Sequence, residues 1–202
     1  MDTAIPTVPS GTTSLDHDAI LRQHLHAHLT TCLSPGDRLL HELSLLQGDA
    51  RADVVLLNGC TVGFEIKAAR DTVRRLARQA GAYAQIFDIA TLVTVEEHME
   101  DAITLLPGWW GIWIAIPDEG GRVSFAVHRE AGANPNRSRL ALATLLWREE
   151  VLEKLASLGA DRGIRTKPKL VLHQRLAEVM PLRELADFVR DTLKRRLNWK
   201  VD

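Results

Sequence analysis

The sequence is poor in cysteine, and its charges almost cancel. Two cysteines among 202 residues, Cys32 and Cys60, are too few for a disulfide framework and too isolated for a thiolate zinc site. They fit reduced thiols in a cytoplasmic protein. The 25 Lys and Arg residues face 26 Asp and Glu residues. Composition alone therefore indicates no nucleic-acid partner, and such a partner would require basic residues gathered on one side.

The sequence also lacks a long hydrophobic run. Its most apolar stretch, WWGIWIAIP at 109–117, is far shorter than the roughly 20 residues that a membrane-spanning helix needs. The first residues have neither the basic nor the apolar part of a signal peptide, so we expect no membrane partner. Residues 1–14 are rich in Pro, Ser, Thr and Gly, which is typical of a disordered lead-in.

The rest of the chain mixes strand and helix patterns. Alternating or continuous apolar runs predict strands at 38–46, 51–57, 61–67, 90–97, 109–116 and 122–128. Helical spacing predicts helices at 14–33, 70–87, 98–106, 139–158 and 181–199, with a basic loop at 159–169. This order predicts an α/β fold with a central mixed β-sheet flanked by helices over 15–150, and a helical C-terminal extension over 151–202 packed on that core.

Two neighbouring predicted strands carry acids and a lysine. Asp53 lies on one, and Glu65 and Lys67 lie on the same face of the next because strand side chains alternate. Two such carboxylates suit a hard divalent cation, Mg²⁺ or Mn²⁺. A protonated lysine cannot bind the ion, but it can orient water or offset charge on a phosphate. Glu42, on the preceding strand, is a candidate third acid.

The turn between these strands decides whether the acids meet. A two-residue Asn58-Gly59 turn would pair Asp53 with Phe64, on the face away from Glu65. We therefore expect an odd-residue connection or a bulge between 57 and 61, most simply with Gly59 in the left-handed region. The Asp53 and Glu65 carboxylates would then lie close enough to share one ion.

A local group of basic residues follows the second of these strands. Four arginines, Arg70, Arg74, Arg75 and Arg78, lie within nine residues of one another in a chain that is nearly neutral. Clustered cations are the usual contacts to a nucleic-acid backbone. The sequence therefore predicts that these four residues bind phosphate.

The pattern of Asp53 followed by Glu65-Ile66-Lys67 resembles the D…ExK signature of the PD-(D/E)xK, restriction-endonuclease-like nuclease superfamily. Gln79 and Tyr83 resemble the QxxxY motif of its RecB-type branch. The stretches ELSLLQGDARADVVLLNG, FEIKAARDTVRRLARQ and LPGWWGI are similar to a small uncharacterised bacterial subfamily, over roughly residues 38–150. One position departs from the pattern, because Ala52 stands where a proline often precedes the aspartate.

The resemblance implies a Mg²⁺-dependent deoxyribonuclease with a restriction-endonuclease-like core. Asp53 and Glu65 would be metal ligands, Lys67 the catalytic lysine, and Gln79 and Tyr83 supporting or substrate-positioning residues. The expected partner is DNA. A homodimer is compatible with cutting both strands of a duplex through one site per chain.

Two other interpretations remain open at this stage. The protein could be a catalytically silent module on a nuclease-like fold that binds nucleic acid or a protein partner. Alternatively, the charged residues could form a solvated strand face with a cross-strand ion pair, and Tyr83 could be an ordinary buried tyrosine beside the amide of Gln79.

Overall fold

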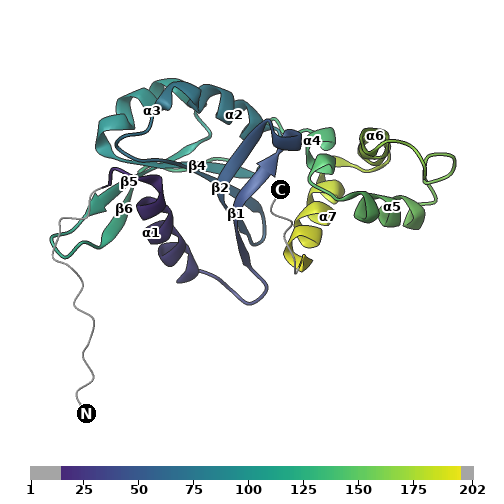
Figure 1. Ribbon diagram of the computed structural model, residues 1–202, viewed down its shortest axis with the longest axis horizontal. Helices are drawn as coiled ribbons and strands as arrows, with labels where there is room; N and C mark the ends of the chain where they lie inside the picture. Colours follow the sequence, from purple (N-terminus) through teal and green to yellow (C-terminus); the bar gives the residue numbers. More distant parts are fainter. Residues whose placement is uncertain (1–14, 197–202) are drawn as a thin grey trace, which may run out of the picture.

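The larger part of the molecule is built on a six-stranded mixed sheet in this computed structural model, which describes residues 15–196 (Figure 1). The strands are β1 (Arg38–Leu45), β2 (Ala50–Leu57), β3 (Thr61–Lys67), β4 (Ile89–Thr94), β5 (Gly111–Pro117) and β6 (Val123–Arg129), and they lie in chain order across the sheet. β3, β4 and β5 are parallel, and the other neighbours are antiparallel. The predicted α/β class with a mixed sheet is confirmed. The predicted lead-in, residues 1–14, lies outside the described residues.

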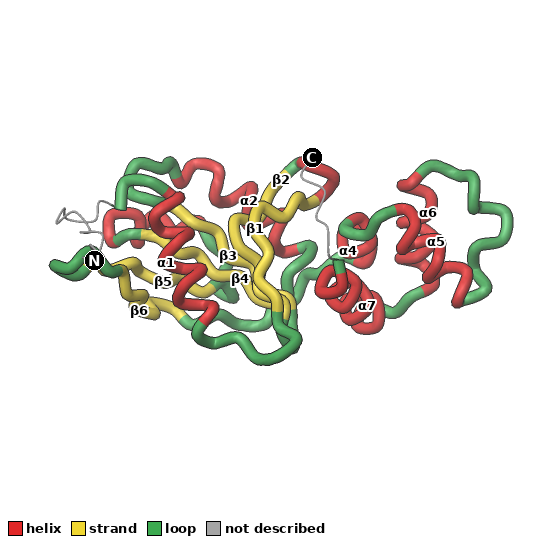
Figure 2. The backbone as a smooth tube through the Cα atoms, turned by 60° about the horizontal axis from the view of Figure 1, so that its bottom comes forward, coloured by secondary structure: helices red, strands yellow, loops and turns green. Residues whose placement is uncertain are grey.

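Helices cover both faces of the sheet (Figures 1 and 2). α1 (Asp18–Thr30) buries Leu21, Leu25 and Leu29 against one face, in a cluster that includes Phe64 and Ile66. The other face carries α2 (Leu76–Ala84) and α3 (Met99–Leu105). The segment predicted as one helix over 70–87 instead begins with a 3-10 turn, η2 (Val73–Arg75). None of the helices in the described residues is both long enough and apolar enough to span a bilayer.

The C-terminal helices form a lobe at one end of the sheet (Figure 2). They are α4 (Arg139–Thr144), α5 (Arg148–Ser157), α6 (Lys169–Val179) and α7 (Leu182–Arg195). The predicted helix over 139–158 is interrupted between α4 and α5. The predicted domain boundary at residue 150 falls within α5. α6 has no counterpart among the predicted helices. Leu142 and Leu172 belong to the same buried cluster as Leu45 of β1, so the core continues from the sheet into the lobe.

β1 and β2 both interrupt their alternation at one point. His41 pairs with Val54 and Leu43 with Ala52, but no pair is formed by Glu42 and Asp53 between them. Glu42 has a positive φ of 55°, which few non-glycine residues adopt. Leu40 and Leu43, three residues apart, consequently enter the same buried cluster. Because both strands are irregular at the same point, the pairs on either side keep the same register. Glu42 and Asp53 therefore need not follow the regular alternation of side chains between the two faces.

The connection between β2 and β3 has three residues. Leu57 pairs with Thr61, and the pairing ends at Val54 with Phe64, so Asp53 and Glu65 are the residues next to the last pair. The predicted odd-residue connection is confirmed. The predicted left-handed Gly59 is wrong, because its φ is not positive. The turn is closed instead by the Asn58 side chain, whose Oδ1 accepts a hydrogen bond of 3.0 Å from the Cys60 N–H.

Candidate active site

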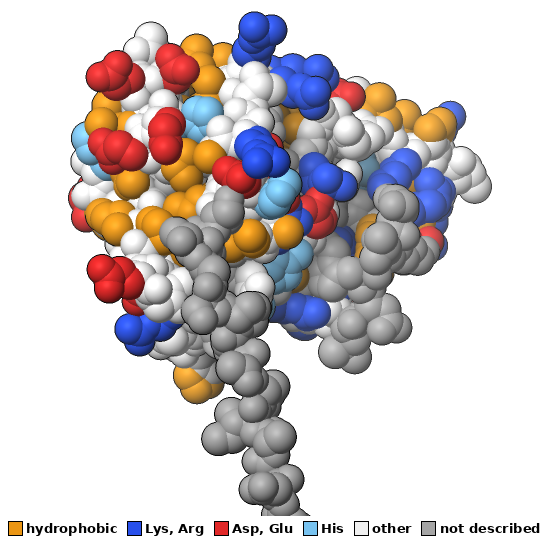
Figure 3. Space-filling view, turned by 60° about the vertical axis from the view of Figure 1, so that its left-hand side comes forward, with side chains coloured by type: hydrophobic (Ala, Val, Ile, Leu, Met, Phe, Trp, Pro, Cys, Tyr) orange, Lys and Arg blue, Asp and Glu red, His pale blue; other side chains and the backbone are white. Residues whose placement is uncertain are grey.

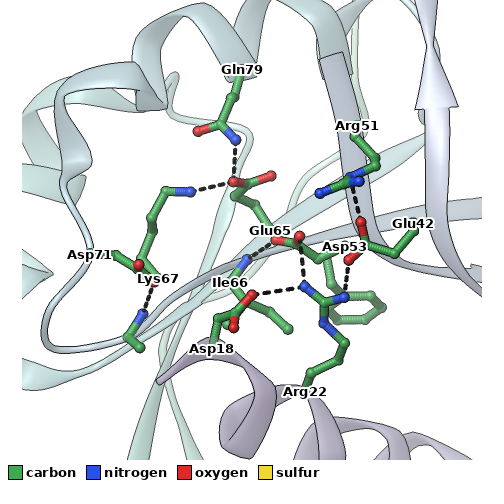
Figure 4. A network of polar contacts seen from close by, with 12 residues as sticks. Asp18, Arg22, Glu42, Arg51, Asp53, Glu65, Ile66, Lys67, Asp71 and Gln79 are labelled. Atoms are coloured by element: carbon green, nitrogen blue, oxygen red, sulfur yellow. Dashed lines mark hydrogen bonds and ion pairs between the residues drawn. The ribbon is translucent and has the colours of Figure 1, made fainter. Parts of the chain in front are cut away.

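Glu65 is a buried carboxylate with three side-chain partners, two of which, Lys67 and Gln79, are labelled in Figure 4. Its Oε1 accepts hydrogen bonds from Lys67 Nζ at 2.5 Å and from the Gln79 amide. Its Oε2 accepts from the Tyr83 hydroxyl at 2.8 Å. Only 1% of Glu65 is exposed, so the interpretation of this residue as part of a solvated strand face is wrong.

α2 supplies two of these partners. Gln79 and Tyr83 are one helical turn apart, so their side chains project from the same side of the helix. Tyr83 is fully buried, and its ring packs at 4.8 Å from the ring of Phe87 and at 5.0 Å from that of Trp110. This packing fixes the hydroxyl at Glu65. Tyr83 is therefore a buried core residue, as the alternative interpretation expected. Its hydroxyl also donates a hydrogen bond to Glu65, an acid of the predicted site.

Lys67 is held at the end of β3 by its backbone as well as its side chain. The Thr94 hydroxyl donates to the Lys67 carbonyl at 2.8 Å. The Asp71 carboxylate then accepts from the Ala68 N–H at 2.8 Å and closes the turn after the strand. The Lys67 side chain is 12% exposed. The ammonium therefore lies at the border between the buried Glu65 and solvent.

Asp53 is bound from two directions. Its Oδ2 accepts a 2.8 Å hydrogen bond from the Ile66 N–H of β3, which takes the place of a further strand pair. Its Oδ1 is 3.2 Å from Arg22 Nη2 on α1. The side chain is 16% exposed. The irregularity of β2 thus places this carboxylate between β3 and α1.

Arg22 belongs to the same network, although the sequence did not indicate it (Figure 4). Besides Asp53, its guanidinium contacts Asp18 at 2.9 Å and the carboxylate of Glu42. Glu42 also forms an ion pair with Arg51. The spacing of Asp18 and Arg22 along one helix is visible in the sequence. No local pattern could show that Arg22 reaches acids 20 and 31 residues away.

Burial dominates the electrostatics of the two central acids. It raises the pKa of Glu65, and the Asp53 charge raises it further, against the opposing effects of Lys67 and of the hydrogen bonds from Lys67 and Tyr83. Burial also raises the pKa of Asp53, against the hydrogen bond from Ile66 and the charges of Arg22 and Lys67. The pKa of Tyr83 is likewise raised, first by burial and then by Glu65, so its hydroxyl remains a donor. Both carboxylates are thus only partly compensated by the protein's own cations.

The donor atoms fit a small divalent cation. An ionised carboxylate has about four acceptor positions. Glu65 uses three of them and Asp53 uses two. Gln79 Oε1 is buried without a hydrogen-bond partner in the described part of the chain. Oxygen donors of this kind suit Mg²⁺ or Mn²⁺, whose remaining positions water and phosphate usually fill.

The third proposed ligand is placed differently. Glu42 is bound by Arg22 and Arg51. Between residues 15 and 196, no three His, Cys, Asp or Glu side chains are grouped so as to hold a metal ion. The structure thus brings Asp53 and Glu65 to the end of the pairing between two neighbouring strands, whereas it places Glu42 in the arginine pairs.

The four predicted phosphate-binding arginines are all exposed. Arg70 lies after β3 and pairs with Asp16 at 2.9 Å. Arg74 and Arg75 lie in η2, and Arg78 in the first turn of α2. These last three form no ion pair with any residue between 15 and 196. On the face shown in Figure 3, most acidic side chains gather on one side and most Lys and Arg side chains on the other.

Comparison with known proteins assigns the chain to a family. The family described as bacteriophage P4 protein cII matches residues 19–201, and the chain belongs to it. No curated protein matches the chain. One similar solved structure is a protein of unknown function from Silicibacter pomeroyi, with 18% sequence identity and a TM-score of 0.41. The match covers 81% of this chain and 100% of that one.

Proposed function

We propose that this protein is a metal-dependent nuclease that hydrolyses phosphodiester bonds, with DNA as the expected substrate. One observation carries the proposal: the buried Glu65, bound by Lys67, and Asp53 both lie next to the last pair between two neighbouring strands, and the Asp53 charge raises the pKa of Glu65. A buried, incompletely compensated pair of acids is unfavourable for stability alone, and such pairs occur mainly where chemistry requires them. Resemblance to the PD-(D/E)xK signature supports the same proposal.

Asp53 and Glu65 would hold one or more divalent cations. When bound, the ion makes a water molecule a better nucleophile and offsets charge on the phosphate. The network supports such binding by its charge. It contains four acids and three bases, which leaves a formal charge of −1, from Asp18, Glu42, Asp53 and Glu65 against Arg22, Arg51 and Lys67. A cation is therefore favoured there on electrostatic grounds.

Lys67 and α2 would each have a part in the reaction. The Lys67 ammonium, at the solvent border of the site, can hydrogen-bond the attacking water or a phosphate oxygen. Gln79 and Tyr83 are positioning residues, because both donate to Glu65 and fix the direction of its carboxylate. The exposed Arg74, Arg75 and Arg78 would contact the backbone of the bound strand.

A metal titration followed by a cleavage assay tests the proposal. The full chain is titrated with Mn²⁺ by calorimetry and then incubated with labelled DNA and Mg²⁺ or Mn²⁺. The proposal expects binding and metal-dependent cuts, both lost in Asp53→Asn and Glu65→Gln. The surface substitution Asp101→Asn on α3 is a matched control and should change neither.

The same assay distinguishes the nuclease from the alternative, a module that binds DNA without cutting it. Metal-independent DNA binding without cleavage in the wild type would favour the silent binding module. Absence of Mn²⁺ binding would reject the metal site itself. Cleavage that persists at full rate in Glu65→Gln would locate the activity elsewhere.

A further inference from the structure

Arg22 is bound where a cation is expected to act. Its guanidinium contacts Asp53, Glu42 and Asp18, so it already supplies positive charge to the acids around the proposed metal site. The Asp53 oxygen that it contacts, Oδ1, has no other hydrogen bond within residues 15–196. At 3.2 Å this contact is also longer than the 2.9 Å contact with Asp18. Arg22 and a metal ion would therefore compete for one oxygen of Asp53.

The side chain of Arg22 can leave Asp53 without moving its helix. α1 is anchored by Leu21, Leu25 and Leu29, which are 0%, 0% and 4% exposed. The Arg22 side chain is 23% exposed, and its Nε, though buried, has no hydrogen-bond partner among the described residues. A change of rotamer is thus opposed only by the three ion pairs, which a divalent cation at Asp53 would weaken.

A hollow beside Arg22 offers the guanidinium another position. It has a volume of about 440 Å³ and lies between α1 and β1, lined by Asp18, Ala19, Arg22, Gln23, His26 and His41. Gln23 has an amide donor, and the rings of His26 and His41 lie with Nδ1 and Nε2 2.9 Å apart. Arginine and side-chain amide groups are common phosphate contacts. The hollow is large enough for a phosphate and part of its sugar.

We propose that a divalent cation displaces Arg22 from Asp53, and that the released guanidinium binds a phosphate of the substrate strand in this hollow. This inference rests on the proposed function, because it requires the metal site. In the metal-free protein the acids hold Arg22 and keep the hollow unfavourable for a phosphate. The bound cation reverses the charge around Asp53, so metal binding and phosphate binding become coupled.

Calorimetric titration of the full chain with Mn²⁺ tests the competition. Arg22→Met removes the competing charge, and its Mn²⁺ dissociation constant should fall by roughly three- to tenfold. Arg122→Met is the matched control: Arg122 also pairs with an acid, Asp118, but it is 88% exposed and lies outside the network of the proposed metal site. Its affinity should equal that of the wild type. A purely structural role for Arg22 predicts the opposite, because removing the link between α1 and the acids would weaken binding.

A DNA-binding measurement tests the phosphate contact. All proteins carry Lys67→Ala, so that the labelled strand stays intact. With Mn²⁺, Arg22→Met should weaken DNA binding by roughly three- to tenfold and lower the salt slope by about 0.7–0.9. Without Mn²⁺ the same substitution should have no such effect, because the acids then hold Arg22. Arg122→Met should bind like its parent under both conditions.

The outcomes separate this inference from the proposed function. Equal Mn²⁺ affinity of wild type and Arg22→Met would overturn the competition and leave the metal site intact. Tighter Mn²⁺ binding with unchanged DNA affinity would overturn the phosphate contact. If neither protein binds Mn²⁺, the proposed function fails with the inference. Arg22→Gln replaces Arg22→Met in both measurements if unfolding curves show that the latter does not fold.

Discussion

The Tyr83 hydroxyl lies 2.8 Å from Glu65 Oε2 and donates a hydrogen bond to it, in a position that is closed to solvent. The same hydroxyl is 3.2 Å from the Phe64 carbonyl. Glu65 therefore links α2 to β3 through the Tyr83 hydroxyl. The stability of the fold consequently depends on an acid of the proposed site.

Tyr83→Phe should lower the free energy of unfolding by about 1–3 kcal/mol, because a buried carboxylate loses its donor while the ring packing remains. Denaturant unfolding of the metal-free protein at pH 7 measures this difference. In a Glu65→Gln background the effect should be smaller, since the charged acceptor is gone. Equal effects in both backgrounds would show that the hydroxyl does not act through Glu65.

The stability of the metal-free protein should depend on the charge of Glu65. Burial raises the pKa of Glu65 above its ordinary value of 4.5, so the folded state binds this proton more tightly than the unfolded state. The contribution is therefore most favourable below about pH 4.5 and is lost as the pH rises through the raised pKa.

Unfolding curves from about pH 4 to about pH 8 in the presence of a chelator measure this effect. The difference between Glu65→Gln and wild type should grow in favour of the variant as the pH rises, since glutamine has no charge to bury. A difference that is independent of pH would mean that Glu65 titrates normally in the folded protein.

Mn²⁺ should raise the melting temperature, because a ligand that binds only the folded state stabilises it. Asp53→Ala and Glu65→Ala should each remove this shift. Glu42→Ala separates two roles for that residue. It should retain the shift if Glu42 serves only the arginine pairs, as its contacts indicate, and abolish it if Glu42 is the predicted third ligand.

Lys67→Ala should reduce DNA cleavage by about 100-fold or more while the protein still binds Mn²⁺, because the ammonium acts on the reaction and cannot bind the ion. Single-turnover cleavage and calorimetry on the same sample provide the two measurements. A variant that cuts at the wild-type rate would remove Lys67 from the mechanism.

The triple variant Arg74→Ala, Arg75→Ala, Arg78→Ala should bind DNA less tightly whatever the sequence, with a salt slope lower by about 0.7–0.9 for each arginine that bound a phosphate. Arg70 is tested separately, because it pairs with Asp16. The exposed Arg183 on α7 provides a single-charge control, and its replacement by alanine should leave the slope unchanged.

Local patterns in the sequence are enough to predict the elements that carry Glu65, Lys67, Gln79 and Tyr83. Alternation and helical spacing act over a few residues, and the need to bring Asp53 near Glu65 predicts an odd connection. The turn itself depends on the Asn58 side chain. A three-residue connection can be closed either by such a side-chain hydrogen bond or by a glycine in the left-handed region. Both solutions fit the same register, so the sequence does not distinguish them.

Other features depend on contacts between distant segments. The interrupted alternation at Glu42 and Asp53 involves two strands, and the contacts of Arg22 with these acids require α1 to pack on the sheet. The helix α6 is a different case, because Leu172, Leu176 and Ala177 already have helical spacing. The apolar spacing that predicts α6 is therefore present in the sequence, directly after the basic loop.

The three-residue turn also limits how this family can change over evolution. Gly59 is exposed and Cys60 is only partly buried, so substitutions at these two positions should be tolerated better than at Asn58, whose side chain closes the turn. A deletion or insertion of one residue would shift β3 by one position against β2 and move Glu65 to the side of α1. Relatives that retain the site should therefore keep an odd number of residues in this loop, whatever its composition.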